Sequence, residues 1–278
     1  MSLLRELFRG ELPHLVMFDL DGTLVDSVPD LAAAIDKTLH DLGRPAAGVA
    51  QVRNWVGNGA LVLVRRALAG DMQHEQVSDA DAEHALEVFL AAYVDNLGLS
   101  AIYPGVRETL KWLKQHGIEM ALITNKPERF VGPLLDDLRI GRYFRWIIGG
   151  DTLPQQKPDP TALLYVLRMA GVSPDEALFV GDSRSDVLAS KAAGVACVAM
   201  SYGYNHGRPI AEESPALVID DLRQLLPGCF EPAAALPLPD AVQSPRSRDS
   251  IVVVPRKHWL VNSGMKILKA LARWRWRA

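Results

Sequence analysis

The chain has 278 residues, 49% hydrophobic and 23% charged, a composition typical of a soluble globular protein. Its net charge of −3 is unevenly spread, because residues 1–249 carry 23 basic and 33 acidic side chains, whereas residues 250–278 carry seven basic side chains and no acidic one. An acidic body argues against a nucleic-acid-binding domain. Two cysteines, Cys197 and Cys229, make no disulfide framework, so we expect a cytoplasmic protein.

The N-terminal stretch MSLLRELFRGELPH mixes charges among its leucines. It lacks the uninterrupted apolar core of a signal peptide, and we expect a short amphipathic helix there. No stretch of the sequence is long and apolar enough to span a bilayer as a helix.

The first predicted strand, in LVMFDLDGTLVDS at residues 15–27, ends in two acidic side chains, Asp19 and Asp21. In an extended chain they point to the same side, because side chains alternate with period two. Like charges this close repel each other, and each is costly to leave unpaired. We therefore expect a cation between them.

Residues 29–99 are helical in pattern throughout, with no convincing strand. We expect an all-helical cap subdomain, inserted between the first and second strands. It leaves the chain just after Asp19 and Asp21, where ligands of parallel sheets bind. The cap can therefore close over whatever these residues hold.

Beyond the insertion, apolar runs alternate with helical patterns that end at glycine. Continuous apolar runs suit strands that are covered on both faces. The alternation predicts a doubly wound parallel α/β sheet, a Rossmann-like core formed by residues 1–28 and 100–226. Its predicted strands lie in the segments HLVMFDL, IEMALIT, RWIIGG, ALFVG, VACVAM and ALVID.

Residues 227–255 are rich in Pro, Ala, Ser and Asp, which predicts a linker with little structure. Residues 256–278 form a basic amphipathic tail, with Ile267, Leu271 and Trp274 on one helical side and basic residues on another. Such a helix can rest on an anionic membrane surface, dock on the protein's own body or on a subunit, or stay unfolded. The sequence leaves these alternatives open.

Polar side chains of complementary kinds follow several predicted strands. Asp182 ends the strand ALFVG, Thr124 and Asn125 end IEMALIT, and Lys157 lies in a turn-like segment. Carboxylates at one edge of a sheet suit Mg²⁺, which takes one or two of them and keeps water and substrate phosphate. A lysine and a hydroxyl suit phosphate oxygens. The sequence therefore predicts a site for a metal ion and a phosphate group.

Four segments together resemble the motifs of the haloacid dehalogenase superfamily, in their order. They are DLDGT at residues 19–23, the strand-ending Thr124, Lys157 before a proline, and GDSRSD at residues 181–186. Each alone has a plain structural explanation, such as a turn or a helix N-cap, but four in order are specific. The helical insertion resembles the small cap of that superfamily, and the match to its phosphoglycolate phosphatases covers residues 15–226.

The resemblance implies catalytic and metal-binding roles. Asp19 is the nucleophile that forms an aspartyl-phosphate, and Asp21 is the general acid and base. Mg²⁺ is held by the Asp19 carboxylate, the Asp21 main-chain carbonyl and the Asp182 carboxylate. Asp186 lies behind these ligands.

The resemblance also implies the residues that bind the phosphate. Lys157 pairs with Asp19 and with the phosphate, which lowers the repulsion between nucleophile and substrate. Thr124, together with Asn125, donates hydrogen bonds to the phosphoryl oxygens. Charge neutralisation and positioning are the main demands of phosphoryl transfer.

An acid two residues after the nucleophile is typical of the superfamily's phosphatases and sugar-phosphate mutases. The implied activity is Mg²⁺-dependent hydrolysis of 2-phosphoglycolate to glycolate and phosphate. Two alternatives stay open: a phosphatase or mutase for another small phosphate ester such as a sugar phosphate, and a tethering or binding protein that acts through its basic tail. The expected partner is a small phosphate ester, and not nucleic acid.

Within the insertion, RNWVGNGA at residues 53–60 resembles a segment of phosphoglycolate phosphatases. It predicts either a plain turn between helices or a loop that faces the substrate. Arg53 and Arg65 are candidates for binding a substrate carboxylate, although most arginines on helices are solvated.

Overall fold

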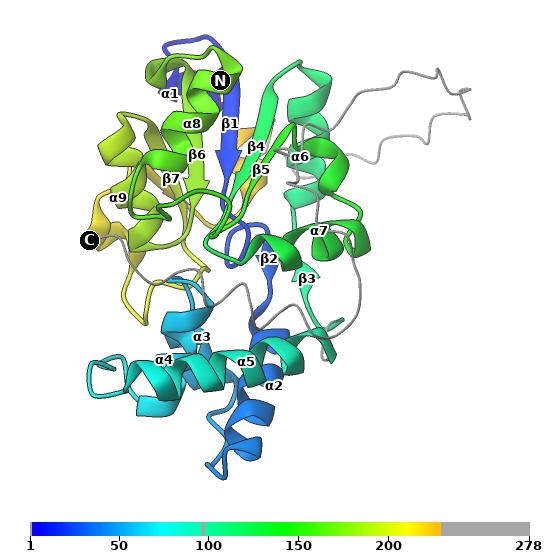
Figure 1. Ribbon diagram of the computed structural model, residues 1–278. Coiled ribbons are helices and arrows are strands. Elements are labelled where there is room, and N and C mark those ends of the chain that lie inside the picture. Colours follow the sequence, from blue (N-terminus) through cyan, green and yellow to red (C-terminus); the bar gives the residue numbers. More distant parts are fainter. Residues whose placement is uncertain (1, 96–97, 229–278) are drawn as a thin grey trace, which may run out of the picture.

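The computed structural model describes residues 2–95 and 98–228 (Figure 1). The predicted basic tail at 256–278, and all but the first two residues of the predicted linker, lie outside the described residues.

All the predicted strands are confirmed. Within the described residues, six parallel strands form one sheet in the order β5-β4-β1-β6-β7-β8. The central strand β1 pairs with β4 on one side and β6 on the other, which is the switch point of a doubly wound sheet. The strands are β1 (Leu15–Phe18), β4 (Glu119–Ile123), β5 (Trp146–Ile148), β6 (Ala177–Gly181), β7 (Ala196–Met200) and β8 (Leu217–Ile219).

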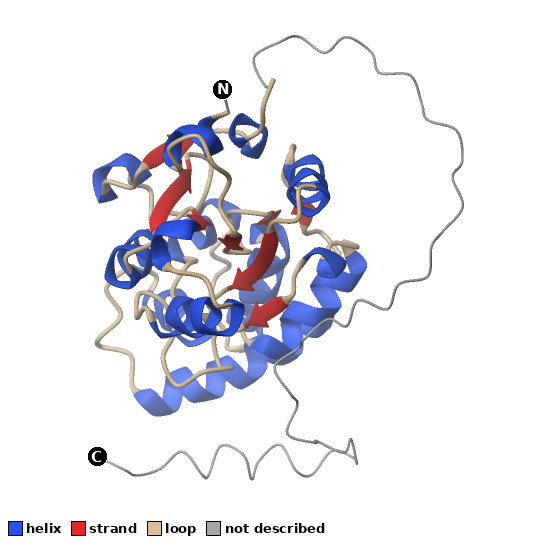
Figure 2. Ribbon diagram, turned by 90° about the horizontal axis from the view of Figure 1, so that it is seen from above, coloured by secondary structure: helices blue, strands red, loops and turns tan. Residues whose placement is uncertain are grey.

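Both faces of the sheet are buried, which explains why its strands are continuously apolar. Val16 and Phe18 of β1 belong to the apolar cluster on one face, and Leu15 and Met17 belong to that on the other. Helices lie on both sides of the sheet in the view of Figure 2. The first face is covered by α1 (Leu3–Leu7), α6 (Val106–Gln115) and α7 (Glu128–Asp137), and the second by α8 (Thr161–Ala170) and α9 (Arg184–Ala193).

Short 3₁₀ turns complete this part of the chain. They are η1 (Gly141–Tyr143), η2 (Pro174–Glu176), η3 (Ile210–Glu213) and η4 (Leu222–Leu225). Helix α1 confirms the helix expected at the N-terminus, although it is only five residues long. In the part of the chain that the structure describes, no helix is long and apolar enough to cross a membrane.

Between β1 and β4 the chain forms a group of helices that we call the helical insertion. Its members are α2 (Val28–Asp41), α3 (Val49–Trp55), α4 (Ala60–Ala69) and α5 (Asp79–Asp95). They share an apolar cluster of their own, in which Ile35 of α2 packs with Phe89 of α5. Phe130 of α7 and the buried Tyr204 join this cluster from the sheet side, so the two parts of the protein are packed together.

Two short strands that the sequence did not predict flank the helical insertion. β2 (Val25–Asp26) and β3 (Ala101–Ile102) pair antiparallel, with Val25 opposite Ile102 and Asp26 opposite Ala101. The insertion lies beyond the end toward which β1 points (Figure 1). The boundaries given above for the core and the cap, including 29–99 for the cap, stay predictions.

Candidate active site

Asp19 lies directly after β1, where its N–H continues the ladder by donating to the Val180 carbonyl at 2.9 Å. The residue is only 7% exposed. The Lys157 ammonium contacts it, with 2.8 Å between Nζ and Asp19 Oδ1, and lies 2.6 Å from Oδ1 of Asp186. Burial alone would lower the Lys157 pKa, but the carboxylates of Asp186 and Asp19 raise it, so this lysine stays charged.

Asp186 is fixed by the start of helix α9. Its Oδ2 accepts hydrogen bonds from the N–H of Asp182 at 3.1 Å and from the N–H of Ser183 at 3.0 Å. Ser183 is the N-cap of the helix and Asp186 its third residue, which together form a capping box. The segment GDSRSD therefore caps a helix and also delivers two carboxylates to the strand ends.

Asp182 is held by two segments from opposite parts of the sequence. Its Oδ1 accepts from the Thr23 hydroxyl, and its Oδ2 accepts from the N–H of Tyr204, each at 2.6 Å. Gly22 has a φ of +89°, and a side chain there would collide with Asp182, as would one at Gly203. These glycines let two loops close around the carboxylate.

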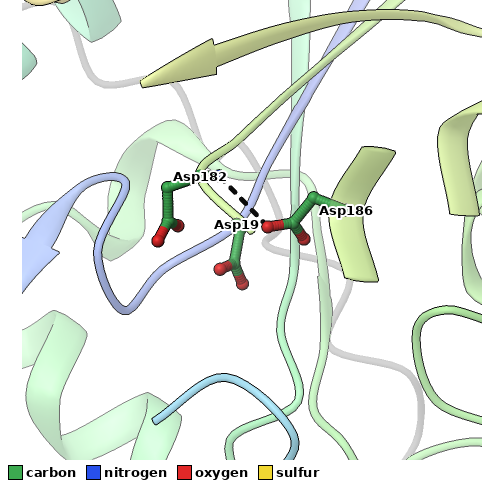
Figure 3. A group of neighbouring side chains, drawn as sticks. All are labelled: Asp19, Asp182 and Asp186. Carbon is green, nitrogen blue, oxygen red and sulfur yellow. Dashed lines mark hydrogen bonds between the residues drawn. The ribbon is translucent and has the colours of Figure 1, made fainter. Parts of the chain in front are cut away.

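Asp19, Asp182 and Asp186 form a buried cluster in which carboxylate oxygens lie within 4.8 Å of one another. Figure 3 shows the side chains gathered in one region, with Asp186 reaching it from α9. Burial and the neighbouring carboxylates raise the pKa of Asp182 well above its usual value, and burial raises that of Asp19 to about 7. Three buried carboxyl groups lie together here, and the single ammonium group of Lys157 cannot neutralise all of them. A divalent cation would supply the missing positive charge, so these residues fit a metal ion.

Each of the two carboxylates has a lysine as a partner: Lys157 contacts Asp19, and a second lysine contacts Asp21. Asp21 is paired with Lys126, whose Nζ lies 3.3 and 3.4 Å from its two carboxylate oxygens. Burial opposes the charge of Lys126, yet Asp21 and Tyr93 raise its pKa above the usual value. The sequence interpretation gave Lys126 no role, and its only hint was its place two residues after Thr124.

Thr124 and Asn125 follow β4 at the same edge of the sheet. The N–H of Thr124 donates to the Ile148 carbonyl at 3.0 Å, and its hydroxyl accepts from the N–H of Lys126 at 3.2 Å. The Asn125 side chain donates to the Lys157 carbonyl at 2.9 Å and to the Gly57 carbonyl at 3.2 Å. Asn125 thus links the loop that holds Lys157 and the helical insertion to the edge of the sheet.

A cavity of about 50 Å³ opens between this edge and the helical insertion. The residues predicted to carry the phosphoryl chemistry and to bind the phosphate all line it, whereas the buried Asp182 does not. Gly57 and Gly59 also line the cavity, so the turn between α3 and α4 does face the site. Much of the remaining wall is apolar and includes Leu31, Phe89 and Phe130.

Neither arginine proposed as a carboxylate binder is among the residues that line the cavity. Arg53 pairs with Asp26 at 3.3 Å, and its guanidinium lies 5.0 Å from the centre of the Tyr204 ring. Arg65 donates to the Val77 carbonyl at 2.7 Å and pairs with Asp79. Both arginines therefore serve contacts away from the cavity.

Known proteins resemble the chain in sequence and in structure. It is 68% identical to a phosphoglycolate phosphatase of Pseudomonas fluorescens strain Pf0-1 and 63% identical to phosphoglycolate phosphatase 1 of Pseudomonas aeruginosa, in both cases over all 278 residues and the whole of the relative. A crystal structure of a predicted phosphoglycolate phosphatase from Haemophilus somnus 129PT superposes with a TM-score of 0.71 and 39% identity, over 77% of this chain and 96% of that one.

The family model for haloacid dehalogenase-like hydrolases matches residues 13–194, which include Asp19, Asp182, the helical insertion and the loop that holds Lys157. With the sheet order and the carboxylates in the places described, this match identifies the chain as a member of the haloacid dehalogenase-like hydrolases.

Proposed function

We propose that this protein is a Mg²⁺-dependent phosphatase that hydrolyses 2-phosphoglycolate to glycolate and phosphate. The observation that carries the proposal is the buried Asp19, which contacts Lys157 at the floor of a small cavity that Asp21 also lines. A nucleophile, a cation and an acid–base group are thereby within reach of one small ligand.

The covalent step is assigned to Asp19. One of its carboxylate oxygens attacks the phosphorus atom, and the bond from phosphorus to the glycolate oxygen breaks. Asp21 gives its proton to the departing alkoxide and later takes one from the water that attacks the phosphorus of the aspartyl-phosphate. Attack by that water releases inorganic phosphate and restores Asp19.

Lys157, Thr124 and Asn125 are proposed to bind the phosphoryl group. Lys157 already lies 2.8 Å from the nucleophile, so it can offset the repulsion between that carboxylate and an approaching phosphate. The Thr124 hydroxyl accepts from the N–H of Lys126, which leaves its own proton for a phosphoryl oxygen.

The proposed ligands for Mg²⁺ are the carboxylates of Asp19 and Asp182 and the main-chain carbonyl of Asp21. When bound, the ion would supply charge neutralisation to the phosphate and the nucleophile. Asp186, which pairs with Lys157 and caps α9, is proposed to support this set from behind. In this proposal the helical insertion acts as the cap, and the enzyme works in the cytoplasm.

The substrate is proposed from the names of the relatives. The relatives at 68% and 63% identity are both called phosphoglycolate phosphatase.

The test is phosphate release from a panel of small phosphate esters, with Mg²⁺ and with a chelator. We expect a Mg²⁺-dependent rate concentrated on 2-phosphoglycolate. Release biased towards sugar phosphates would contradict the substrate. Turnover that needs a bisphosphate activator and releases little phosphate would instead indicate a mutase.

A further inference from the structure

The cavity holds a cation that the phosphoryl chemistry does not use. Among the described residues that line it, the cationic side chains are Lys126 and Lys157. Lys157 is engaged by Asp19 and Asp186, at 2.8 and 2.6 Å. The substrate of the proposed function carries a carboxylate besides its phosphate, and Arg53 and Arg65 both serve other contacts.

Lys126 has donor capacity left for a ligand. An ammonium group has three donors, and its contacts to Asp21, at 3.3 and 3.4 Å, are longer than the roughly 2.7–2.9 Å of a good charge-assisted hydrogen bond. Its backbone is fixed, because the Lys126 carbonyl accepts from the N–H of Gly150 at 2.8 Å. The ammonium therefore lies at the cavity wall between Asp21 and the Tyr93 hydroxyl, and its third donor is left for a ligand.

Tyr93 of helix α5 lies against the same ammonium, with 4.8 Å between Lys126 Nζ and the ring centre. The residue is 1% exposed, and within the described residues its hydroxyl finds no acceptor for its proton. Burial raises the pKa of Tyr93, so the hydroxyl keeps that proton at neutral pH. A buried donor without an acceptor, beside a cation in the same cavity, indicates a missing anionic partner.

The surroundings strengthen such a contact. The walls next to Tyr93 include Phe89 and Phe130, with 5.7 Å between the ring centres of Phe89 and Tyr93 and 5.0 Å between those of Tyr93 and Phe130. Apolar walls exclude water and lower the local dielectric constant, which makes a hydrogen-bonded ion pair worth more than at the surface.

We propose that Lys126 and Tyr93 together bind the carboxylate of the substrate, and so set the specificity for a phosphate ester that carries an acid group. This inference rests on the proposed function. Lys126 follows β4 of the sheet, and Tyr93 belongs to helix α5 of the helical insertion. A carboxylate bound to both side chains would therefore contact both parts of the protein.

The test is a specificity ratio: kcat/KM for 2-phosphoglycolate divided by kcat/KM for ethyl phosphate, which has a methyl group in place of the carboxylate. Lys126→Met should lower the ratio by about 10- to 100-fold, since a charged hydrogen bond is lost, and most of the loss should be a higher KM for 2-phosphoglycolate. Any effect on Asp21 acts on both esters and cancels in the ratio.

Tyr93→Phe keeps the pair of Lys126 and Asp21 and serves as the second variant. It should lower the same ratio by about 3- to 10-fold, the effect of one neutral hydrogen bond. Arg65→Gln removes a positive charge of the helical insertion away from the cavity and is the matched control, for which we expect a ratio within about twofold of wild type.

The outcomes separate the two proposals. A wild-type ratio near one would overturn the proposed substrate and this inference with it. A large wild-type ratio that Lys126→Met leaves within about twofold would overturn the inference alone. Should Lys126→Met not fold, as judged by circular dichroism, Tyr93→Phe decides, and an unchanged ratio overturns the proposal. Inhibition constants of 3-phosphonopropionate and propylphosphonate give the same ratio without turnover.

Discussion

The edge of the sheet and the helical insertion build opposite sides of one cavity with opposite chemistry. The sheet edge, with the loops that follow it, supplies buried charges such as Asp19 and Lys157, which contact each other at 2.8 Å. The insertion supplies apolar walls and the single hydroxyl of Tyr93. In the proposals above, the sheet edge carries the reaction, and the choice of substrate is shared between Lys126 of that edge and Tyr93 of the insertion.

The largest expected effect comes from the sheet side. Asp19→Asn removes the nucleophile and should lower phosphate release by at least about 10⁴-fold, because no other carboxylate of the cluster lines the cavity as it does. The measurement is phosphate release at saturating substrate, with Asp41→Asn, on the exposed side of α2, as control. Substantial activity in a folded Asp19→Asn protein would contradict the assignment.

Metal removal should affect activity and stability together. A chelator should abolish phosphate release, and Mg²⁺ should raise the melting temperature of the wild type, because an ion that binds only the folded state stabilises it by about 2.7 kcal/mol at 100 times its Kd. Asp182→Asn should lose most of this Mg²⁺-dependent rise. A thermal scan with and without Mg²⁺ checks both, and an equal rise in the variant would exclude Asp182 as a ligand.

A change in the insertion should affect stability and substrate affinity rather than the chemistry. Phe89 is 2% exposed, and Phe89→Ala should lower the free energy of unfolding by about 3–5 kcal/mol through lost burial and a cavity. We expect a higher KM and a kcat within about tenfold of wild type, since Asp19 and Lys157 are unchanged. Urea unfolding and steady-state kinetics test this. A large loss of kcat at unchanged KM would contradict the assignment of the chemical step to the sheet side alone.

The smallest expected effect is a dependence on pH where the two regions meet. Nδ1 of His206 donates to the Asn54 carbonyl of α3 at 2.8 Å, and burial, followed by the nearby Arg66, lowers the His206 pKa below 6.5. The unfolded chain therefore takes up this proton at a higher pH than the folded protein does. Stability should fall as the pH drops below about 6.5, by no more than about 1.4 kcal/mol per unit for one proton.

His206→Gln should flatten this part of the curve. The measurement is urea unfolding between pH 7.5 and pH 5.5 for both proteins, and the difference between the two curves isolates His206 from other groups that titrate. Parallel curves would show that His206 does not contribute.

Features that depend on neighbours in the sequence were predictable. The apolar runs predicted every strand of the parallel sheet, and the residue types at their ends placed Asp19, Thr124 and Asp182 at one edge, because parallel strands end together. Helix α7 was not predicted, and Pro133 within it is one reason, since proline interrupts a helical pattern.

Features that depend on partners distant in the sequence were not predictable. Lys126 follows a strand like many loop lysines, and nothing near it indicates that Asp21, 105 residues away, would be its partner. The same holds for Tyr204, whose N–H holds Asp182, and for Tyr93, which the pattern of α5 marks only as part of an apolar face. The roles that the resemblance assigned to individual residues stay predictions until the variants are measured.

The short pair of β2 and β3 has a consequence for how such a protein can change over time. Asp26 and Ala101 lie opposite each other in an antiparallel pair, so the whole helical insertion begins and ends at neighbouring points. In geometric terms it is a very long hairpin loop, which a turn of a few residues could replace. A gene segment that encodes a different insertion could be exchanged at this ribbon, and the inherited sheet would keep its strand order.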